Sequence, residues 1–250
     1  KIGPRINAAG RMESGRKSVD LLVCDQIKDA DVISKKINSF NLDRRNIDTE
    51  ITRQAIDMIQ NDASLKELSS TVLYNPEWHK GVIGIVASRL TETYYRPTLV
   101  FTRSGGKLTA SARSVRGFDV YQALESCSEY IDQFGGHTYA AGLTIEESRF
   151  QEFKARFEQV VTETILPEQL EPQIQVDLKV HLSEITPKLA RILRQFAPFG
   201  PGNPSPVFEA GPLRDTGYAR QVGEGGAHLK LSVTQEGSGP VGGIGFGLGE

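Results

Sequence analysis

The tripeptide Gly-Gly-His at 135–137, followed by Ala-Ala-Gly at 140–142, has residue types suited to chemistry on a phosphate. Two glycines permit unusual backbone angles and expose N–H groups to an anion. An imidazole beside them can hydrogen-bond a scissile phosphate or stabilise charge in its transition state. We therefore take His137 as a candidate catalytic residue, with Gly135 and Gly136 as candidate substrate contacts. A loop with an incidental histidine is the alternative.

Ser111 and Arg113 lie two residues apart on a predicted strand, so both side chains point to one face. A hydroxyl and a guanidinium projecting together suit a terminal phosphate, which carries extra charge and extra oxygens. Arg116 would extend such a pocket. An ordinary exposed strand face is the alternative.

The segment 4–11 combines small residues with Asn7 and Arg11. Small residues let the backbone approach a ligand, the Asn7 amide can donate a hydrogen bond, and Arg11 can form two hydrogen bonds to a phosphate. A loop leading into a helix, with a surface arginine, has the same pattern.

A second basic segment precedes a predicted helix. Trp78, His79 and Lys80 stand just before glycines whose N–H groups can hold an anion, and Arg89 follows two turns later. His79 and Arg89 are thus candidate substrate contacts. The alternative is a core tryptophan beside a satisfied histidine, and we favour the structural role for Trp78.

No motif for a catalytic metal is visible. Hydrolysis of phosphodiesters commonly uses two metal ions held by clustered Asp and His residues, but the four histidines are scattered and no HExxH or Asp-His-His occurs. Asp29 and Asp31 open a long helix, where acids interact favourably with the helix dipole. We therefore assign no metal ligand, and P-loop, dinucleotide and nucleophile-elbow motifs are also missing.

The elements that would position these residues alternate between helices and strands. Residues 1–15 are predicted to form a loop, and 29–60 carry one apolar stripe at helical spacing, which predicts a strut of roughly 48 Å. The remaining predicted strands are 71–74, 98–102, 107–113 and 140–145, with helices at 81–94, 119–127 and 146–165.

A different pattern follows the predicted linker 167–172. Residues 174–180 alternate as in a half-buried strand, and Thr186 and Pro187 begin a predicted helix that runs to Phe196. Short strands with glycine turns then predict a small β-barrel or sandwich; they lie at 207–209, 218–222, 228–234 and 241–246.

Charge and cysteine content add two expectations. The chain has a net charge of −2, yet 79–117 holds seven basic residues and one acid, whereas 118–171 holds eleven acids and three basic residues. This suggests a basic face that holds a polyanion, or else random scatter. Two cysteines in 250 residues favour a reducing, cytoplasmic location, and no apolar run is long enough for a membrane span.

Five motifs occur in a fixed order and together resemble the RecJ family of the DHH phosphoesterase superfamily over nearly the whole chain: GPRINAAGRM, WHKGVIGIVASRL, SARS, GGHTYAAGL and FAPFGPGNPSPVF. The last motif, at 196–208, looks like the opening of an OB-fold. It separates this chain from the nanoRNases and cyclic-dinucleotide phosphodiesterases of the superfamily, which share a GGH-type DHHA1 domain.

The resemblance implies an α/β fold with four parts: the end of a DHH domain with the following loop (1–28), a connecting helix (29–66), a DHHA1 domain (67–166) and an OB-fold (172–250). The abrupt start at a lysine and the end within a strand pattern suggest a fragment with a truncated OB-fold. In the intact protein, Mn²⁺ or Mg²⁺ would be held by the DHH domain. This chain would bind no metal and would be inactive alone.

The implied function is a 5′→3′ single-stranded DNA exonuclease of DNA repair and recombination. Its partner would be single-stranded DNA, with single-strand-binding protein and a helicase as further partners. By the resemblance, Ser111 and Arg113 would bind the 5′ phosphate and the residues 135–137 would approach the scissile phosphate. Asn7 and Arg11 would reach the substrate near a cleft, and His79 and Arg89 would support that wall. The alternatives are a nanoRNase, a cyclic-dinucleotide phosphodiesterase, or a non-catalytic module that binds single strands.

Overall fold

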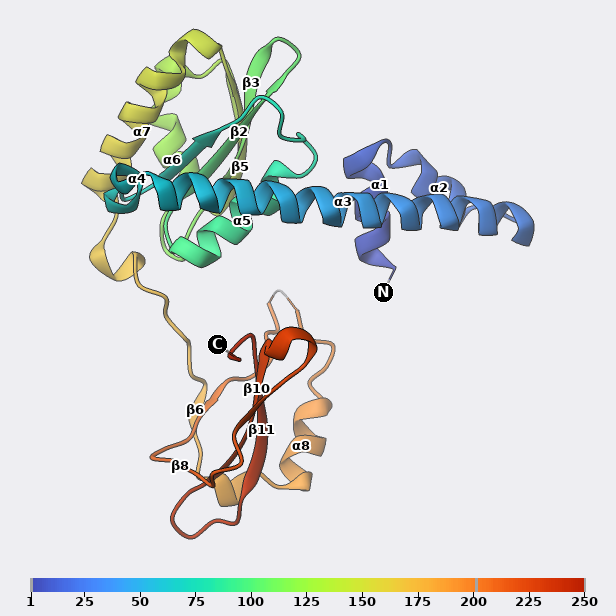
Figure 1. The fold of residues 1–250 in the computed structure, drawn as a ribbon, viewed down its shortest axis with the longest axis vertical. Coiled ribbons are helices and arrows are strands. Elements are labelled where there is room, and N and C mark those ends of the chain that lie inside the picture. The colour runs from blue at the N-terminus through green and yellow to red at the C-terminus, as the bar shows by residue number, and fades with distance from the viewer. Residues whose placement is uncertain (1, 201, 250) are drawn as a thin grey trace. The chain divides into compact units, whose positions relative to one another are not determined.

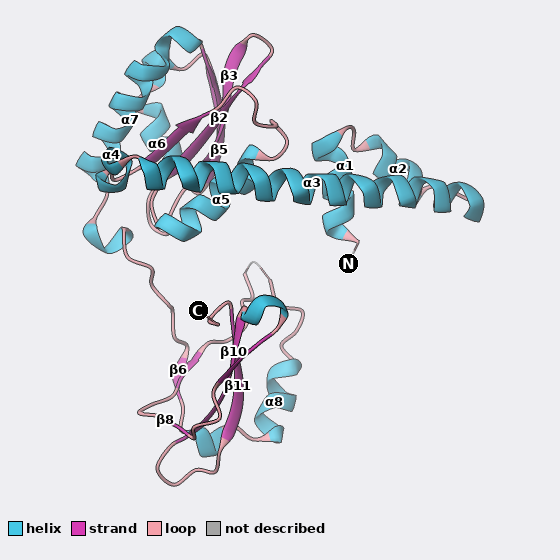
Figure 2. Cartoon of the chain, in the orientation of Figure 1, coloured by secondary structure: helices cyan, strands magenta, loops and turns pink. Residues whose placement is uncertain are grey.

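The computed structural model describes residues 2–200 and 202–249. The chain divides into two compact units, Lys1–Pro172 (unit 1) and Gln173–Glu250 (unit 2). Unit 1 combines helices with a five-stranded sheet, whereas unit 2 consists mainly of strands and loops (Figure 2). No described helix has both the length and the apolar character that a membrane crossing needs.

Unit 1 begins with three helices, α1 (Gly3–Met12), α2 (Arg16–Leu22) and α3 (Ile27–Asn61). The predicted loop over 1–15 is therefore wrong. Pro4 lies in the first turn of α1, where its missing N–H costs nothing. Ala8 and Ala9 are fully buried, and α1 packs against α3, so tertiary burial stabilises a helix that its flanking glycines obscured (Figure 1).

The long helix is confirmed. Its buried residues lie along one side of the helix, as the helical repeat requires. Among them, Ile51, Ala55 and Ile59 pack against the sheet domain. The earlier part of α3 lies beside α1 and α2 instead (Figure 1). One continuous helix thus carries both the N-terminal helices and the sheet domain.

The sheet of unit 1 has the order β1-β2-β3-β5-β4, with β1 parallel to β2 and all other neighbours antiparallel. Its strands are β1 (Thr71–Tyr74), β2 (Thr98–Ser104), β3 (Lys107–Arg113), β4 (Gln133–His137) and β5 (Ala140–Ile145). The predicted hairpin turn at Gly105 and Gly106 is confirmed, since both adopt positive φ. The Gly-Gly-His segment, for which a loop was the alternative interpretation, is the edge strand β4, because it pairs along its length with β5.

Helices cover both faces of this sheet. One face packs against α3 and α5 (Ile83–Tyr94), and the other against α6 (Val120–Glu125) and α7 (Phe150–Thr164). A short helix, α4 (Ala63–Glu67), joins α3 to β1. Strand β3 alternates strictly, with Leu108, Ala110 and Ala112 in the α6–α7 core. Thr109, Ser111 and Arg113 therefore face the α5 side.

Unit 2 contains β6 (Leu178–Lys179), α8 (Pro187–Arg194), β7 (Phe208–Glu209), β8 (Arg214–Asp215), β9 (Arg220–Val222), β10 (His228–Thr234) and β11 (Val241–Phe246). Strand β10 pairs with β8, β9 and β11, and β6 pairs with β7. The Thr186 side chain caps α8 as predicted. The half-buried strand predicted at 174–180 is wrong: only two residues form β6 and both are exposed, because they pair with one short strand and face no core.

Short 3₁₀ helices fill several connections in both units: Ser128–Tyr130, Glu147–Arg149, Pro167–Gln169, Leu182–Glu184 and Glu224–Gly226. Within the described part of unit 2, Leu182 is the one buried large hydrophobic side chain. The large core of the chain therefore lies in unit 1.

Candidate phosphate-binding site

Arg113 and Ser111 form one hydrogen-bonded pair on β3. The Arg113 guanidinium donates from Nη1 to Ser111 Oγ at 2.9 Å and to the Ala112 carbonyl oxygen at 2.7 Å. Its Nε donates to Ser88 Oγ on α5 at 3.1 Å. These bonds fix the plane of the guanidinium, and Nη2 has no protein acceptor among the described residues. A preorganised Nη2 edge is suited to binding an anion.

Glycine makes room for this pair. A Cβ atom on Gly84 of α5 would lie 3.0 Å from Ser111 Oγ and 3.1 Å from Arg113 Nη2. A side chain there would therefore push the helix away from β3. Ser88, one turn further along α5, is the acceptor for Arg113. Sequence reasoning missed both residues, although their four-residue spacing on one helix face was a signal that they act together.

The pair opens into a hollow of about 560 Å³, which Arg11, His79 and Lys80 also line. The α1 helix reaches this hollow because Gly81 has no side chain: a Cβ atom there would lie 2.0 Å from the Arg11 carbonyl oxygen. Arg11 Nη1 in turn donates to the Gly81 carbonyl oxygen at 3.3 Å. The structure thus brings Arg11, His79, Ser111 and Arg113 together around one cavity.

The hollow is electropositive. Among the described residues, no carboxylate forms an ion pair with Arg11, Lys80 or Arg113. Burial lowers the pKa of Arg113, and the positive charge of Arg11 lowers it further. An anion placed between these cations would relieve both the repulsion and the lost solvation.

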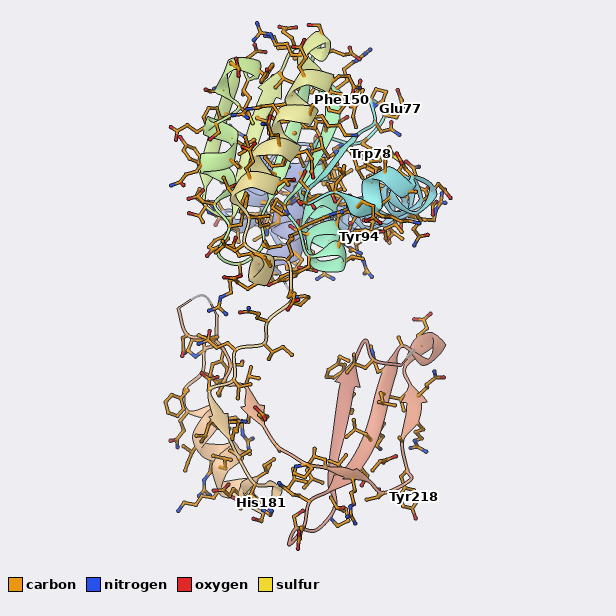
Figure 3. The ribbon with its side chains drawn as sticks, turned by 90° about the vertical axis from the view of Figure 1, so that its left-hand side faces the viewer. Glu77, Trp78, Tyr94, Phe150, His181 and Tyr218 are labelled. Atoms are coloured by element: carbon orange, nitrogen blue, oxygen red, sulfur yellow. The ribbon has the colours of Figure 1, made fainter. Side chains whose placement is uncertain are left out.

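His79 is oriented by its own turn. Its Nδ1 accepts a hydrogen bond from the Gly81 backbone N–H at 3.0 Å, so in the neutral ring the proton is on Nε2. Trp78, by contrast, is buried in the core between α3 and the sheet, and its indole N–H donates to Gln54 at 2.8 Å (Figure 3). The structural role predicted for Trp78 is confirmed.

His137 lies on the same face of the sheet as Arg113. Register places Arg113 opposite Ala140, and Ala140 opposite His137, so the three share one row across β3, β5 and β4. Two strand spacings, about 10 Å, separate the two ends of the row. His137 is exposed and accepts a hydrogen bond on Nδ1 from the Tyr139 N–H at 3.3 Å. It is not among the residues that line the hollow.

At position 136, glycine is needed because the neighbouring strand β5 leaves no room for a side chain. A Cβ atom there would lie 2.3 Å from the Ala140 carbonyl oxygen and 2.5 Å from the Ala141 Cα. This close approach allows β4 to pair tightly with β5 just before His137. Gly135 has no such constraint, since a Cβ there meets nothing within 4 Å.

Asn7 and Arg89 lie away from the main hollow. Asn7 lines a smaller one of about 200 Å³ with Arg11 and Arg44. Arg89 donates from Nη2 to Asp48 on α3 at 2.8 Å, and Arg44 lies 3.3 Å from the same carboxylate oxygen. The structure does not place Arg89 in the site: it joins α5 to α3. Sequence reasoning missed Asp48 because its partner Arg89 is far along the chain.

Several residues of the basic face predicted over 79–117 have partners within the protein. Arg103 pairs with Glu147 at 2.6 Å, and Lys107 contacts Asp132 at 3.0 Å. Arg96 is buried and donates to backbone oxygens at the end of α4, including that of Leu65 at 2.6 Å. Lys80 and Arg113 of this segment have no carboxylate partner among the described residues, and both line the hollow.

A two-metal centre does not fit these residues. The described part of the chain contains no group of three or more His, Cys, Asp or Glu side chains that could hold a metal ion. The site can bind and orient an anion, and we assign no step through a metal to it.

Two family models match the chain. The DHHA1 domain model matches residues 67–163, and the RecJ OB domain model matches residues 176–250. The first span runs from β1 into α7 and includes strand β4 and the residues Ser111 and Arg113 of β3. The second span lies within unit 2.

Curated relatives are similar over nearly the whole chain. The single-stranded-DNA-specific exonuclease RecJ of Salmonella typhimurium is 36% identical over 99% of this chain and 44% of its own length. The RecJ of Escherichia coli is 36% identical over 96% of this chain and 42% of its own, and that of Bacillus subtilis is 31% identical over 100% and 32%. The chain spans less than half the length of these relatives.

Solved structures agree. RecJ from Thermus thermophilus in complex with Mn²⁺ matches with a TM-score of 0.82 and 29% identity, covering 100% of this chain and 35% of that one. An exonuclease RecJ bound to manganese matches with a TM-score of 0.59 and 31% identity, covering 68% and 41%. A Mg²⁺ complex of the Thermus protein matches similarly, with a TM-score of 0.81.

Proposed function

Because this chain belongs to the RecJ family and carries its DHHA1 and OB domains, we propose that it is the substrate-holding part of a single-stranded-DNA-specific exonuclease. Its unit 1 would bind the phosphorylated 5′ end of the strand. The RecJ OB match over 176–250 favours this function over that of a nanoRNase or a cyclic-dinucleotide phosphodiesterase.

One observation carries the proposal: a fixed guanidinium and hydroxyl face a hollow whose cations lack carboxylate partners among the described residues. A terminal phosphate bears more negative charge than an internal phosphodiester, so several unpaired cations favour it over the rest of the strand. Arg113 and Ser111 would contact the phosphate directly. Arg11 and Lys80 would add charge, and His79 can donate from Nε2.

His137 would act on the strand further along. It shares a row with Arg113 at about two strand spacings, so a strand held by its 5′ phosphate would run across β5 toward β4. Its exposed imidazole could then hydrogen-bond the scissile phosphate. Holding the terminal phosphate at one end of the row and the linkage near the other would give 5′→3′ polarity.

Unit 2 offers a surface for the rest of the strand. On one face of its sheet, His228 and Phe246 are register partners whose rings stack edge to face at 5.2 Å. Arg220 on β9 and Lys230 on β10 are register partners, and Lys230 lies on the same face of the sheet as His228. Tyr218, 78% exposed, precedes β9 (Figure 3). Aromatic rings beside cations bind single-stranded nucleic acid by stacking and by phosphate contacts.

The test compares 5′-phosphorylated with unphosphorylated oligothymidylate in a fluorescence anisotropy titration. The chain should prefer the phosphorylated end, and Arg113→Ala should abolish that preference while leaving residual binding through unit 2. Arg53→Ala is the matched control, because Arg53 is exposed on α3 and pairs with Glu50 and Asp57. Equal preference in the Arg113→Ala variant and the unmodified chain would refute the assignment of the pocket.

A second candidate is a module that binds single strands without cutting them. The absence of a metal-binding group in the described residues favours it for this chain by itself. With Mn²⁺, both candidates are expected to leave 5′-labelled single-stranded DNA uncut, so the anisotropy titration separates them instead. The substrate-holding part of an exonuclease should prefer a 5′-phosphorylated end, whereas a general binding module should bind phosphorylated and unphosphorylated ends alike.

A further inference from the structure

Two glycines face each other across β4 and β5. Gly135 is the register partner of Gly142, and Gly142 is the partner of Ser111 on β3. Partners on antiparallel strands point to the same face. The three residues therefore form one row on the face where Ser111 and Arg113 line the hollow. Beyond the Ser111 hydroxyl, this row has no side chain.

The fold itself does not require glycine at these two positions. A Cβ atom on Gly135 would meet nothing within 4 Å, and one on Gly142 would meet only the Ala110 carbonyl oxygen at 3.7 Å, an ordinary contact. Neither residue adopts a positive φ, in contrast to Gly136 beside them. Glycine weakens a strand because it loses more conformational freedom than any other residue. In strands it often marks the close approach of a ligand.

The bare row joins two hollows. Thr109, Ala110 and Gly142 line both the hollow of about 560 Å³ that contains Arg113 and a second hollow of about 250 Å³ that contains Gly135. Gly135 and Gly142 are exposed, so neither α5 nor any other described element covers this part of the sheet. A trough thus runs from the Arg113 side over Gly142 to the edge strand that ends in His137.

We propose that Gly135 and Gly142 form the floor on which the first nucleotide of the bound strand lies. This inference rests on the proposed function. The 5′ phosphate would be held by Ser111 and Arg113, and the sugar that follows would contact the glycine backbone directly. A side chain on either residue would lift the nucleotide from the sheet and break its alignment with His137. These glycines would therefore set how closely the strand approaches the sheet.

The decisive variant is Gly142→Val in the complete 250-residue chain. Valine favours strands and its Cβ would meet no close neighbour, so the melting temperature should stay the same or rise. The dissociation constant for 5′-phosphorylated oligothymidylate should nevertheless increase roughly tenfold, equivalent to about 1.4 kcal/mol. Gly135→Ala should show the same pattern with a smaller loss. Arg53→Ala, on an exposed part of α3 outside both hollows, is the control and should leave the dissociation constant unchanged.

The outcomes separate the two proposals. If Gly142→Val binds as tightly as the unmodified chain, the floor is refuted and the phosphate pocket stands. If the unmodified chain shows no preference for a 5′ phosphate, the proposed function fails and the floor fails with it. A lowered melting temperature in Gly142→Val would mean that the fold needs this glycine. Gly135→Ala, whose Cβ has open space, would then decide by its binding alone.

Discussion

Arginines in two regions of unit 1 differ in their partners. Where α5 meets α3, Arg44 and Arg89 share the buried carboxylate of Asp48, at 3.3 and 2.8 Å. Where α5 meets β3, Arg113 is held by hydroxyl and carbonyl oxygens, and the positive charge of Arg11 lowers the pKa of Arg113. In the first region a protein carboxylate offsets part of the positive charge, whereas in the second no carboxylate among the described residues pairs with Arg113. An arginine's neighbours, rather than its place in a motif, thus decide whether its charge is offset within the protein.

The largest effect should come from the region in which Asp48 pairs with two arginines. Asp48→Ala would leave two arginines without their carboxylate. Breaking a fully buried ion pair from one side costs about 3–5 kcal/mol, and the half-exposed Arg89 side chain reduces the expected loss below that. Urea unfolding monitored by circular dichroism would measure the loss in the free energy of unfolding. Arg113→Ala should cost far less in the same assay. Equal losses in the two variants would remove the distinction between the regions.

A smaller effect should appear in the salt dependence of binding. Lys80 lines the hollow without an ion-pair partner among the described residues, whereas Lys107 contacts Asp132 and Glu146. Each phosphate contact with a single strand adds about 0.7 to the slope of log K against log salt concentration. Lys80→Ala should lower the slope by roughly that amount. Lys107→Ala should leave it unchanged, and an equal change in both would mean that the charge is not focused at the hollow.

The cysteines offer a comparison of reactivity rather than of charge. Burial raises the pKa of the Cys127 thiol to about 11, so it stays protonated at neutral pH. Cys24 is only partly buried. Labelling with a thiol reagent at pH 8, followed by mass spectrometry, should modify Cys24 well before Cys127. Rapid labelling of Cys127 in the folded chain would show that the α6–α7 core opens readily.

Sequence patterns predicted elements whose cause is local. The β2–β3 hairpin needs positive φ at Gly105 and Gly106, and α8 is capped by the Thr186 side chain. Both elements depend on neighbouring residues and could therefore be predicted from the sequence. The strand β4 and the helix α1 were not. Gly-Gly-His has little strand propensity, and β4 exists because β5 pairs with it. Helix α1 depends on burial of small residues against a distant helix.

In the candidate site, too, local features could be predicted from the sequence and long-range contacts could not. The Ser111–Arg113 pair followed from strand alternation, a local rule. The ion pair of Arg89 was not predictable, because its partner Asp48 lies on another helix and no short-range pattern joins them. Its role in supporting the wall of the site stays a prediction. The seven basic residues between 79 and 117 suggested one face, but their partners follow only from the fold.

The smallest effect concerns the exposed pair of Arg103 and Glu147, which lie 2.6 Å apart. The hydrogen bond from Arg103 lowers the pKa of the Glu147 carboxyl. A carboxyl whose pKa is lower in the folded state stabilises the fold above its unfolded pKa, and the gain is lost as the pH falls through the folded value. The melting temperature of Glu147→Gln should therefore lie slightly below that of the unmodified chain at pH 7 and should converge with it as the pH is lowered below 4. A gap that persists at low pH would show that the pair acts through packing rather than charge, and a gap as large as that of Asp48→Ala would show that exposure does not weaken such pairs here.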